Sequence, residues 1–237
     1  MQKMPFGDLF LNEFFEVRGN HMGFMSIVQQ IIGGFGTTLF IFFCTLLFSM
    51  PLGILFALAR MSKFKPLNIF MQVCISILRG TPLMLQLIVV FFMPYYVFGI
   101  KLSTGWRVYA ALIGFSINYA ACFGEIFRAG IQAVPVGQHE AAEVLGFTKT
   151  QTFFKIVFPQ MVKRVVPPVT NEVITLVKDT SMAFAIAYAE MFTMAKQVAA
   201  QQSNIMPLFV AGLFYYIFNI VVAWVMGRVE KKLSYFE

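Results

Sequence analysis

Long apolar runs separated by short polar stretches organise the chain. Four of these runs lie at 33–60, 83–100, 109–131 and 207–226. Each is close to or above the roughly 20 residues that a helix needs to cross the hydrocarbon core of a membrane. Because the runs are continuously apolar rather than alternating with polar residues, they predict transmembrane helices and not the strands of a barrel.

A fifth span is predicted at 153–188, although charged residues and prolines interrupt it. Such a helix is tolerated in a membrane when its polar side faces a bundle interior or a wet cavity. Residues 66–78 form a shorter apolar helix that ends at the break Arg79-Gly80-Thr81-Pro82, and 190–204 is polar. The pattern therefore predicts an all-α integral membrane protein with about five transmembrane helices.

The composition agrees with this fold class. Of 237 residues, 59% are hydrophobic, 12% are charged and 29 are Phe, which is more apolar side chain than a soluble domain of this size can bury. The net charge of +7 would indicate nucleic acid only if the basic residues formed a water-facing patch. They flank the predicted spans instead, so no nucleic-acid partner is expected.

The basic residues also predict the orientation. Twelve fall on one side of the predicted membrane, five on the other, and Lys178 lies in the fourth span. Since Lys and Arg accumulate in cytoplasmic loops, the N-terminus is predicted outside and the C-terminus inside. Residues 1–32 are then an extracytoplasmic segment, without the pattern of a signal peptide, and 233–237 a cytoplasmic tail.

The sequence offers no candidate for covalent chemistry. Cys44, Cys74 and Cys122 lie far apart in apolar sequence, and neither His21 nor His139 has a cysteine or carboxylate at ligand spacing. No metal site or disulfide framework is therefore predicted. A membrane-embedded enzyme would need a nucleophile with a base or a metal cluster in the spans, so no catalytic residue is predicted.

The polar stretch between the third and fourth spans has the pattern of a short capped helix. Pro135 is a helix start and Gly146 a helix stop, while Glu140 and Glu143 suit the N-terminal half of a helix dipole. Its apolar side chains share one face, at i, i+3 and i+4: Ala141, Val144 and Leu145. This predicts a rod about 13 Å long, either an inert surface loop or an element that lies in a groove of a partner.

The spacing in this loop resembles the signature loop of binding-protein-dependent ABC importer permeases. Glu140-Ala141-Ala142 is followed after three residues by Gly146, after nine more by Ile156 and after two more by Pro159; only Phe158 departs, where the family usually has Leu. Other stretches are similar to the polar amino-acid branch, of the histidine, glutamine and cystine permease type: Gly36-Thr37-Thr38-Leu39, Arg79-Gly80-Thr81-Pro82 with Gln86, Glu125-Ile126-Phe127-Arg128-Ala129-Gly130-Ile131, and Lys178-Asp179-Thr180-Ser181.

The resemblance implies a type I ABC importer transmembrane domain over 33–232, with the coupling loop at 135–159. The loop helix would be the coupling helix that docks on a separate ATPase subunit, and its expected contact residues are Gly137, Glu140, Ala141, Ala142, Glu143 and Gly146. The chain contains no G-x-x-x-x-G-K-[ST] stretch, so ATP and Mg²⁺ are expected on two copies of that ATPase and no cofactor on this chain.

Further partners follow from the same resemblance. They are an extracytoplasmic substrate-binding protein, a second permease subunit that is identical or related, and the lipid bilayer of the bacterial cytoplasmic membrane. The implied function is that of a permease subunit for ATP-driven import of a polar amino acid. The alternative is an ion-coupled secondary carrier, but such carriers usually show a doubled set of spans with internal symmetry, and none is visible here.

Polar side chains within the spans need an explanation, because a charge at mid-bilayer costs roughly 2.5 to 3.5 kcal/mol. One explanation is structural pairing, of Glu125 with Arg128 three residues on, and of Lys178 with Asp179 or a neighbouring helix. The other is a transient site for the ammonium and carboxylate groups of an amino acid. The candidates for such a substrate path are Asn118, Glu125, Lys178, Asp179, Thr180, Ser181 and Glu190.

Overall fold

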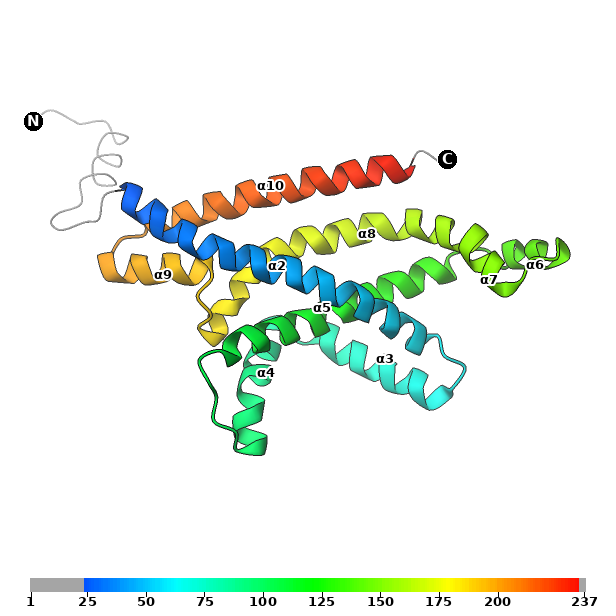
Figure 1. The fold of residues 1–237 in the computed structure, drawn as a ribbon, viewed down its shortest axis with the longest axis horizontal. Coiled ribbons are helices and arrows are strands. Elements are labelled where there is room, and N and C mark those ends of the chain that lie inside the picture. Colours follow the sequence, from blue (N-terminus) through cyan, green and yellow to red (C-terminus); the bar gives the residue numbers. More distant parts are fainter. Residues whose placement is uncertain (1–23, 235–237) are drawn as a thin grey trace, which may run out of the picture.

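The computed structural model describes residues 24–234, and within that range every regular element is helical, which confirms the predicted fold class. Four long helices run roughly along the long axis of the molecule (Figure 1): α2 (Phe24–Arg60), α5 (Trp106–Gln132), α8 (Phe158–Asp179) and α10 (Met206–Ser234). Helix α2 begins near one end of this axis, and α10 starts near the same end and runs toward the other (Figure 1).

Length and composition decide which helices can cross a membrane unaided. Helices α2, α5 and α10 each qualify. Helices α3 (Lys65–Gly80) and α4 (Leu83–Phe98) meet at a bend of 111° and qualify only together, so the described residues hold three candidate spans, or four if the bent pair counts as one. The predicted fourth span is present as α8, a continuous helix of 22 residues, but its polar composition keeps it from qualifying.

The first helix begins earlier than the sequence predicts. It starts at Phe24 rather than at Gly33, and its added turns bury Ile27 and Ile31 against α9 (Met191–Gln202). The sequence predicts only a polar stretch where α9 lies. Neither α9 nor the first turns of α2 carries a pattern that reveals their contact with each other. Of the predicted N-terminal segment, residues 24–32 thus belong to α2, and 1–23 lie outside the described part of the chain.

The last helix is likewise longer than the apolar run predicts. Helix α10 continues through the basic residues Arg228, Lys231 and Lys232 to Ser234, so the predicted tail boundary at 233 falls inside the helix. Residues 235–237 lie outside the described range. Cations near a helix C-terminus are favourable partners for its exposed carbonyls, which explains why the helix persists beyond its apolar part.

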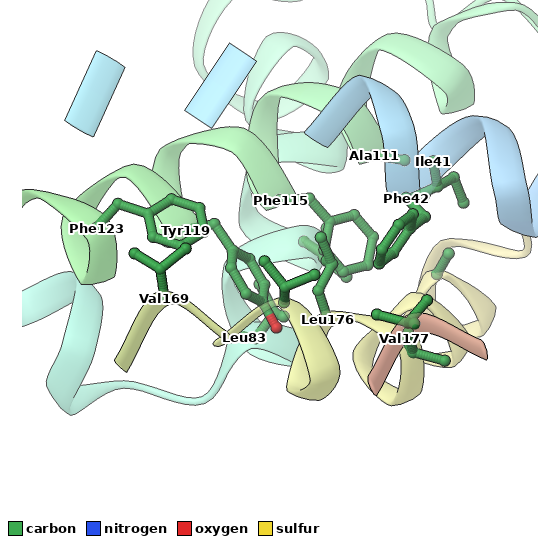
Figure 2. Close-up of a cluster of buried hydrophobic side chains, with 14 of the residues drawn as sticks. Ile41, Phe42, Leu83, Ala111, Phe115, Tyr119, Phe123, Val169, Leu176 and Val177 are labelled. Carbon is green, nitrogen blue, oxygen red and sulfur yellow. The ribbon is translucent and has the colours of Figure 1, made fainter. Parts of the chain in front are cut away.

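The main hydrophobic core lies where α2, α4, α5 and α8 meet (Figure 2). Along α5, Phe115, Tyr119 and Phe123 recur every fourth residue and are buried, so they form one stripe on the helix. Their neighbours come from the other three helices and include Ile41, Phe42, Leu83, Leu87, Val169, Val173, Leu176 and Val177. This packing fixes the inward face of α8, and with it the direction of that helix's polar side.

Helices α2 and α5 approach each other closely at two glycines. A Cβ at Gly53 would lie 2.9 Å from the Phe123 Cβ, and a Cβ at Gly124 would lie 2.9 Å from the Phe56 Cβ. Small residues allow such close backbone contact in membranes, where helix association depends on packing and hydrogen bonds rather than on the hydrophobic effect. The contact holds α5, with its polar residues, in a fixed position against α2.

Between α5 and α8 the chain leaves the bundle at one end, which we call the loop end (Figure 1). There it forms α6 (Val136–Val144), α7 (Lys149–Thr152) and a single π-helical turn, η1 (Phe153–Val157), which leads directly into α8. Helix α6 confirms the short helix predicted between the third and fourth spans. After α8, a 3₁₀ segment, η2 (Thr180–Ile186), leads to α9 at the opposite end.

Candidate functional site

Helix α6 has nine residues and is closed at both ends by local backbone geometry. Pro135 precedes it with φ −58° and ψ 140°, a conformation that the proline ring favours. After it, Gly146 takes φ +77°, which lies in the left-handed region that glycine tolerates. The N–H groups of Gly146 and Phe147 donate to the carbonyls of Glu143 and Ala142 at 2.9 and 3.0 Å, and so satisfy carbonyls that a helix end leaves unpaired.

The outer side of α6 carries exposed apolar side chains. Val144, the last residue of α6, is 88% exposed; Leu145, which follows it, is 74% exposed, and Val136, the first residue of the helix, is 70% exposed. Most of the predicted contact residues are exposed as well: Gly137, Glu140, Ala141, Glu143 and Gly146. Apolar side chains gathered on a protruding helix indicate a contact surface for another protein.

Ala142 is the exception among the predicted contact residues. It is fully buried, and its carbonyl accepts the N–H of Phe147, where the chain turns back after the helix. About 100° of helix rotation separates Ala142 from Ala141 and turns it toward its own chain, so Ala142 is not exposed for contact with a partner as the sequence predicts. Its small side chain supports α6 from the inside.

Polar contacts at its base connect α6 to the bundle. The Arg164 guanidinium of α8 donates to the carbonyl of Ala133, which follows α5. The Gln160 amide of α8 donates to the Gln138 side chain of α6 at 3.5 Å. Helix α8 thus contacts the chain on both sides of Pro135, once before α6 and once within it.

The polar residues at the break between α3 and α4 bond to one another. The Gln86 amide nitrogen donates to the carbonyls of Leu78 and Thr81 at 2.7 and 3.1 Å and to the Thr81 hydroxyl at 2.8 Å. Asn118 of α5 donates to the same Leu78 carbonyl at 3.1 Å and to Gln86 Oε1 at 3.0 Å. Backbone groups freed by a helix break must be satisfied internally in lipid, so Asn118, a predicted path residue, has a structural use here.

Replacing Asn118 with Ala should lower the free energy of unfolding by about 1 to 3 kcal/mol. Gln86 Oε1 loses its hydrogen-bond donor, and the Leu78 carbonyl loses one of its two donors. Denaturation of the purified chain in detergent measures this. Asn171→Ala on the exposed side of α8 is the matched control and should change stability by less than about 0.5 kcal/mol. An equal loss in both variants would contradict the assignment.

Glu125 is held by two arginines. Its Oε2 accepts from Nε and Nη2 of Arg128 at 3.0 and 2.6 Å, and its Oε1 lies 3.9 Å from Nε of Arg60. The predicted i, i+3 pairing is therefore confirmed. Arg60 comes from the end of α2, and its participation could not be inferred from spacing along α5.

The four residues of the run Lys178–Ser181 differ in their hydrogen-bond partners. Thr180 and Ser181 bond to backbone carbonyls, whereas the side chains of Lys178 and Asp179 do not. The Thr180 and Ser181 hydroxyls donate to the carbonyls of Val177 and Lys178, both at 2.7 Å. Asp179 Oδ2 accepts from the hydroxyl of Tyr119 on α5 at 2.8 Å. Lys178 is exposed and forms no ion pair with a described residue, so the predicted pairing with Asp179 is absent from this structure.

Glu172 is a candidate site residue that the sequence analysis did not select, because it counted only as one of the charges that interrupt the fourth span. It is half-buried. Glu172 and Asp179 are seven residues apart, so they share one face of α8. Two acidic residues at this spacing in a predicted membrane helix were the feature of the sequence that could have identified Glu172 as a candidate.

A polar stripe on α8 has no cover from the described chain. Arg164, Asn171 and Lys178 follow one another at intervals of seven residues, about two turns, and all three are exposed. The opposite face of α8 carries Val165 and Val173 into the core. Since charged groups are costly against lipid, the stripe must face another protein chain or a water-filled path.

Glu190 lies at the opposite end of the molecule and is completely buried. Its carboxylate accepts from the N–H groups of Phe192 and Thr193, both at 2.7 Å, and from the hydroxyls of Thr193 and Tyr215, both at 2.8 Å. These bonds make Glu190 the N-cap of α9 and tie α9 to α10. Sequence reasoning predicted it as a path residue and did not find this role.

Long apolar helices, an uncovered polar stripe among them and an exposed capped helix at one end define an integral membrane subunit with surfaces suited to other protein chains. The sequence model described as "Binding-protein-dependent transport system inner membrane component" matches residues 49–235. The chain therefore belongs to the family of binding-protein-dependent transport system inner membrane components. The resemblance drawn from the loop motif is confirmed.

Curated relatives cover nearly the whole chain. The L-cystine transport system permease protein TcyB of Bacillus subtilis is 35% identical over 216 residues, which cover 88% of this chain and 91% of that protein. The arginine transport system permease protein ArtQ of the same organism is 34% identical over 218 residues, with 90% and 98% covered. A putative glutamine transport system permease protein GlnP of Rickettsia bellii is 36% identical over 188 residues, with 79% and 85% covered.

Two solved structures share the fold. The crystal structure of an amino acid ABC transporter with histidines matches with a TM-score of 0.80 and 28% identity, covering 90% of this chain and 100% of that one. An inward-facing structure of the MetNI methionine ABC transporter matches with a TM-score of 0.68 and 17% identity, covering 90% and 99%. At the lower identity the likeness concerns the fold alone.

Proposed function

We propose that this chain is the permease subunit of an ATP-driven importer and carries a polar amino acid across the bacterial cytoplasmic membrane. The observation that carries the proposal is the capped helix α6, whose exposed apolar face is centred on Val144 and Leu145. Family membership supports the same function, and the relatives are named as permeases for cystine, arginine and glutamine.

In the proposed mechanism, α6 docks in a groove on a separate ATPase subunit. The aliphatic face enters the groove, while Glu140 and Glu143, which are exposed beside it, select a basic rim through charge complementarity. ATP and Mg²⁺ are held by that partner, present in two copies. Opening and closing of the ATPase pair displace α6, and the contacts of Gln160 and Arg164 pass the displacement to α8.

A second permease subunit completes the path. The stripe of Arg164, Asn171 and Lys178 is exposed along α8, and a second copy or a related chain would turn it inward, toward the path between the two bundles. Substrate arrives on an extracytoplasmic binding protein at the α9 end and leaves at the loop end. In this arrangement the loop end is cytoplasmic, the N-terminus is outside and the C-terminus is inside.

Along this path, Glu172, Lys178 and Asp179 are the groups that we assign to transient contact with the ammonium and carboxylate of the substrate. Glu172 and Asp179 are both half-buried on one side of α8. The Asp179 carboxylate is oriented by the hydroxyl of Tyr119. Opposite charges spaced along one helix suit a zwitterion, which presents both signs.

Glu172→Gln and Asp179→Asn should each lower the rate of amino-acid uptake about tenfold, because a hydrogen bond to a charged group contributes roughly 1.5 to 3 kcal/mol. Uptake of labelled amino acids into cells measures the rate, with the amount of chain in the membrane determined in parallel. Glu230→Gln in the last turns of α10 is the control and should leave uptake unchanged. Unchanged uptake in both test variants would remove these carboxylates from the path.

Reconstitution tests the function itself. The chain, its ATPase and its binding protein are placed in vesicles with cystine, arginine or glutamine as labelled substrate. We expect uptake that requires ATP and persists without an ion gradient. Uptake that continues without ATP and without the ATPase, but collapses with the gradient, would identify an ion-coupled carrier instead.

A further inference from the structure

An apolar cleft of about 440 Å³ lies next to the loop end, between α2, α5 and the first turns of α8. Every residue that lines it is apolar, and the lining includes Ile54, Leu58, Phe127, Phe153, Phe158 and Val162. Its rim is open, because Ile54, Leu58 and Phe158 are 51%, 54% and 42% exposed. The cleft is therefore a notch in the side of the bundle rather than part of the polar stripe.

The chemistry of the lining determines the occupant. No lining side chain offers water a hydrogen bond, and apolar cavities of this kind exclude water. The helices that form the cleft include two candidate spans, α2 and α5, so the medium at its open side is hydrocarbon. A hydrocarbon chain can fill the notch and restore the dispersion contacts that an empty space loses.

Basic side chains at the loop end indicate the headgroup of the ligand. Lys63 follows the end of α2, and Lys155 lies in η1, between the lining residues Phe153 and Phe158. Both lysines are exposed, and neither forms an ion pair with a described residue. The Lys155 ammonium lies 5.5 Å from the centre of the Phe147 ring, which holds the cation on the surface of this end. Basic side chains at a membrane surface attract anionic headgroups.

We propose that the cleft binds one acyl chain of an anionic phospholipid, with the phosphate against Lys155. The bound chain supports η1, the π-helical turn that joins the α6–α7 loop to α8, because Phe153 and Phe158 form one wall of the cleft. Phe158 is the position where the sequence departs from the usual Leu of the family motif. The ligand thus stabilises the connection between the loop and the bundle.

Native mass spectrometry of the full-length chain, purified in mild detergent and supplied with phosphatidylglycerol, tests the site. We expect the wild type to retain phosphatidylglycerol, and Leu58→Trp and Val162→Trp, which fill the cleft from two different helices, to retain about tenfold less. Leu55→Trp is the matched control, since Leu55 is 60% exposed on the same helix but does not line the cleft. It should retain the lipid as the wild type does.

A second arm tests the headgroup. Lys155→Glu should abolish the preference for phosphatidylglycerol over phosphatidylcholine, while Lys196→Glu on α9, at the opposite end, should keep it. Retention of detergent alone by the wild type, equal retention in Leu55→Trp and both cleft-filling variants, or an unchanged preference in Lys155→Glu would each overturn the proposal. The readout needs neither ATPase nor substrate, so its outcome is independent of the proposed transport function.

Discussion

The double variant Val144→Asp, Leu145→Asp should reach the membrane in normal amounts and lose ATP-driven uptake by about 100-fold or more. Both side chains are largely exposed in the isolated chain, at 88% and 74%, so charging them disturbs no internal packing. Burial of an aliphatic side chain in a partner contributes roughly 1.5 to 3 kcal/mol, and losing two such contacts weakens docking by at least about 3 kcal/mol, or about 100-fold.

Co-purification with the ATPase and uptake in cells measure this result. Thr150→Asp, an exposed position on α7, is the control for added charge near the loop and should behave as the wild type does. Glu140→Arg should uncouple transport through its reversed charge. Gly146→Pro should do so because proline holds φ near −65°, whereas Gly146 takes φ +77°.

Cysteine crosslinks placed along 137–146 complete this test. In native membranes they should capture the ATPase, most efficiently from exposed positions and least from the buried Ala142. Normal uptake in the double variant, or crosslinks that never capture an ATPase, would exclude α6 from energy coupling.

Glu190→Ala should lower the free energy of unfolding by about 3 to 5 kcal/mol, the largest stability effect that we predict. The substitution leaves two N–H groups at the start of α9, one of them buried, and the hydroxyls of Thr193 and Tyr215 without their acceptor. It also removes the only link in this network between α9 and α10. Thermal unfolding of the purified chain, followed by circular dichroism, measures the loss.

Two further variants distinguish capping from a role in the path. Glu190→Gln keeps one acceptor oxygen and should cost about half as much, while Tyr215→Phe removes a single donor and should cost about 1 to 2 kcal/mol. If Glu190→Ala unfolds like the wild type but abolishes uptake, the carboxylate serves the substrate and not the fold.

The sequence predicts those features of the fold and the candidate site that are set by residues close together in the chain. Lipid requires every span to satisfy its own backbone groups, so long apolar runs are sufficient to predict α5 and most of α2 and α10. The caps of α6 are equally local, since Pro135 and Gly146 act on neighbouring backbone. The pairing of Glu125 with Arg128 lies within one helical turn and was predicted for the same reason.

Residues whose partners are distant in sequence were assigned incompletely or missed. Asn118 bonds a carbonyl 40 positions away, Tyr119 reaches Asp179 across 60, and the Thr38 hydroxyl accepts the N–H of Met191 across 153. Helix α9 and the first turns of α2 pack against each other. Neither segment has an apolar pattern that predicts this contact by itself. The bond between Glu190 and Tyr215, 25 positions away, belongs to the same group, whereas the capping bonds of Glu190 to Phe192 and Thr193 are local and were missed.

The sequence by itself thus determined a helical membrane subunit with a short capped helix between two of its long helices, because lipid and helix ends impose rules on contiguous residues. Only the tertiary structure decided which polar groups are already bonded, which face of α8 is uncovered and that Ala142 turns inward. Those properties depend on the rotation and packing of helices from separate parts of the chain, which no local pattern specifies.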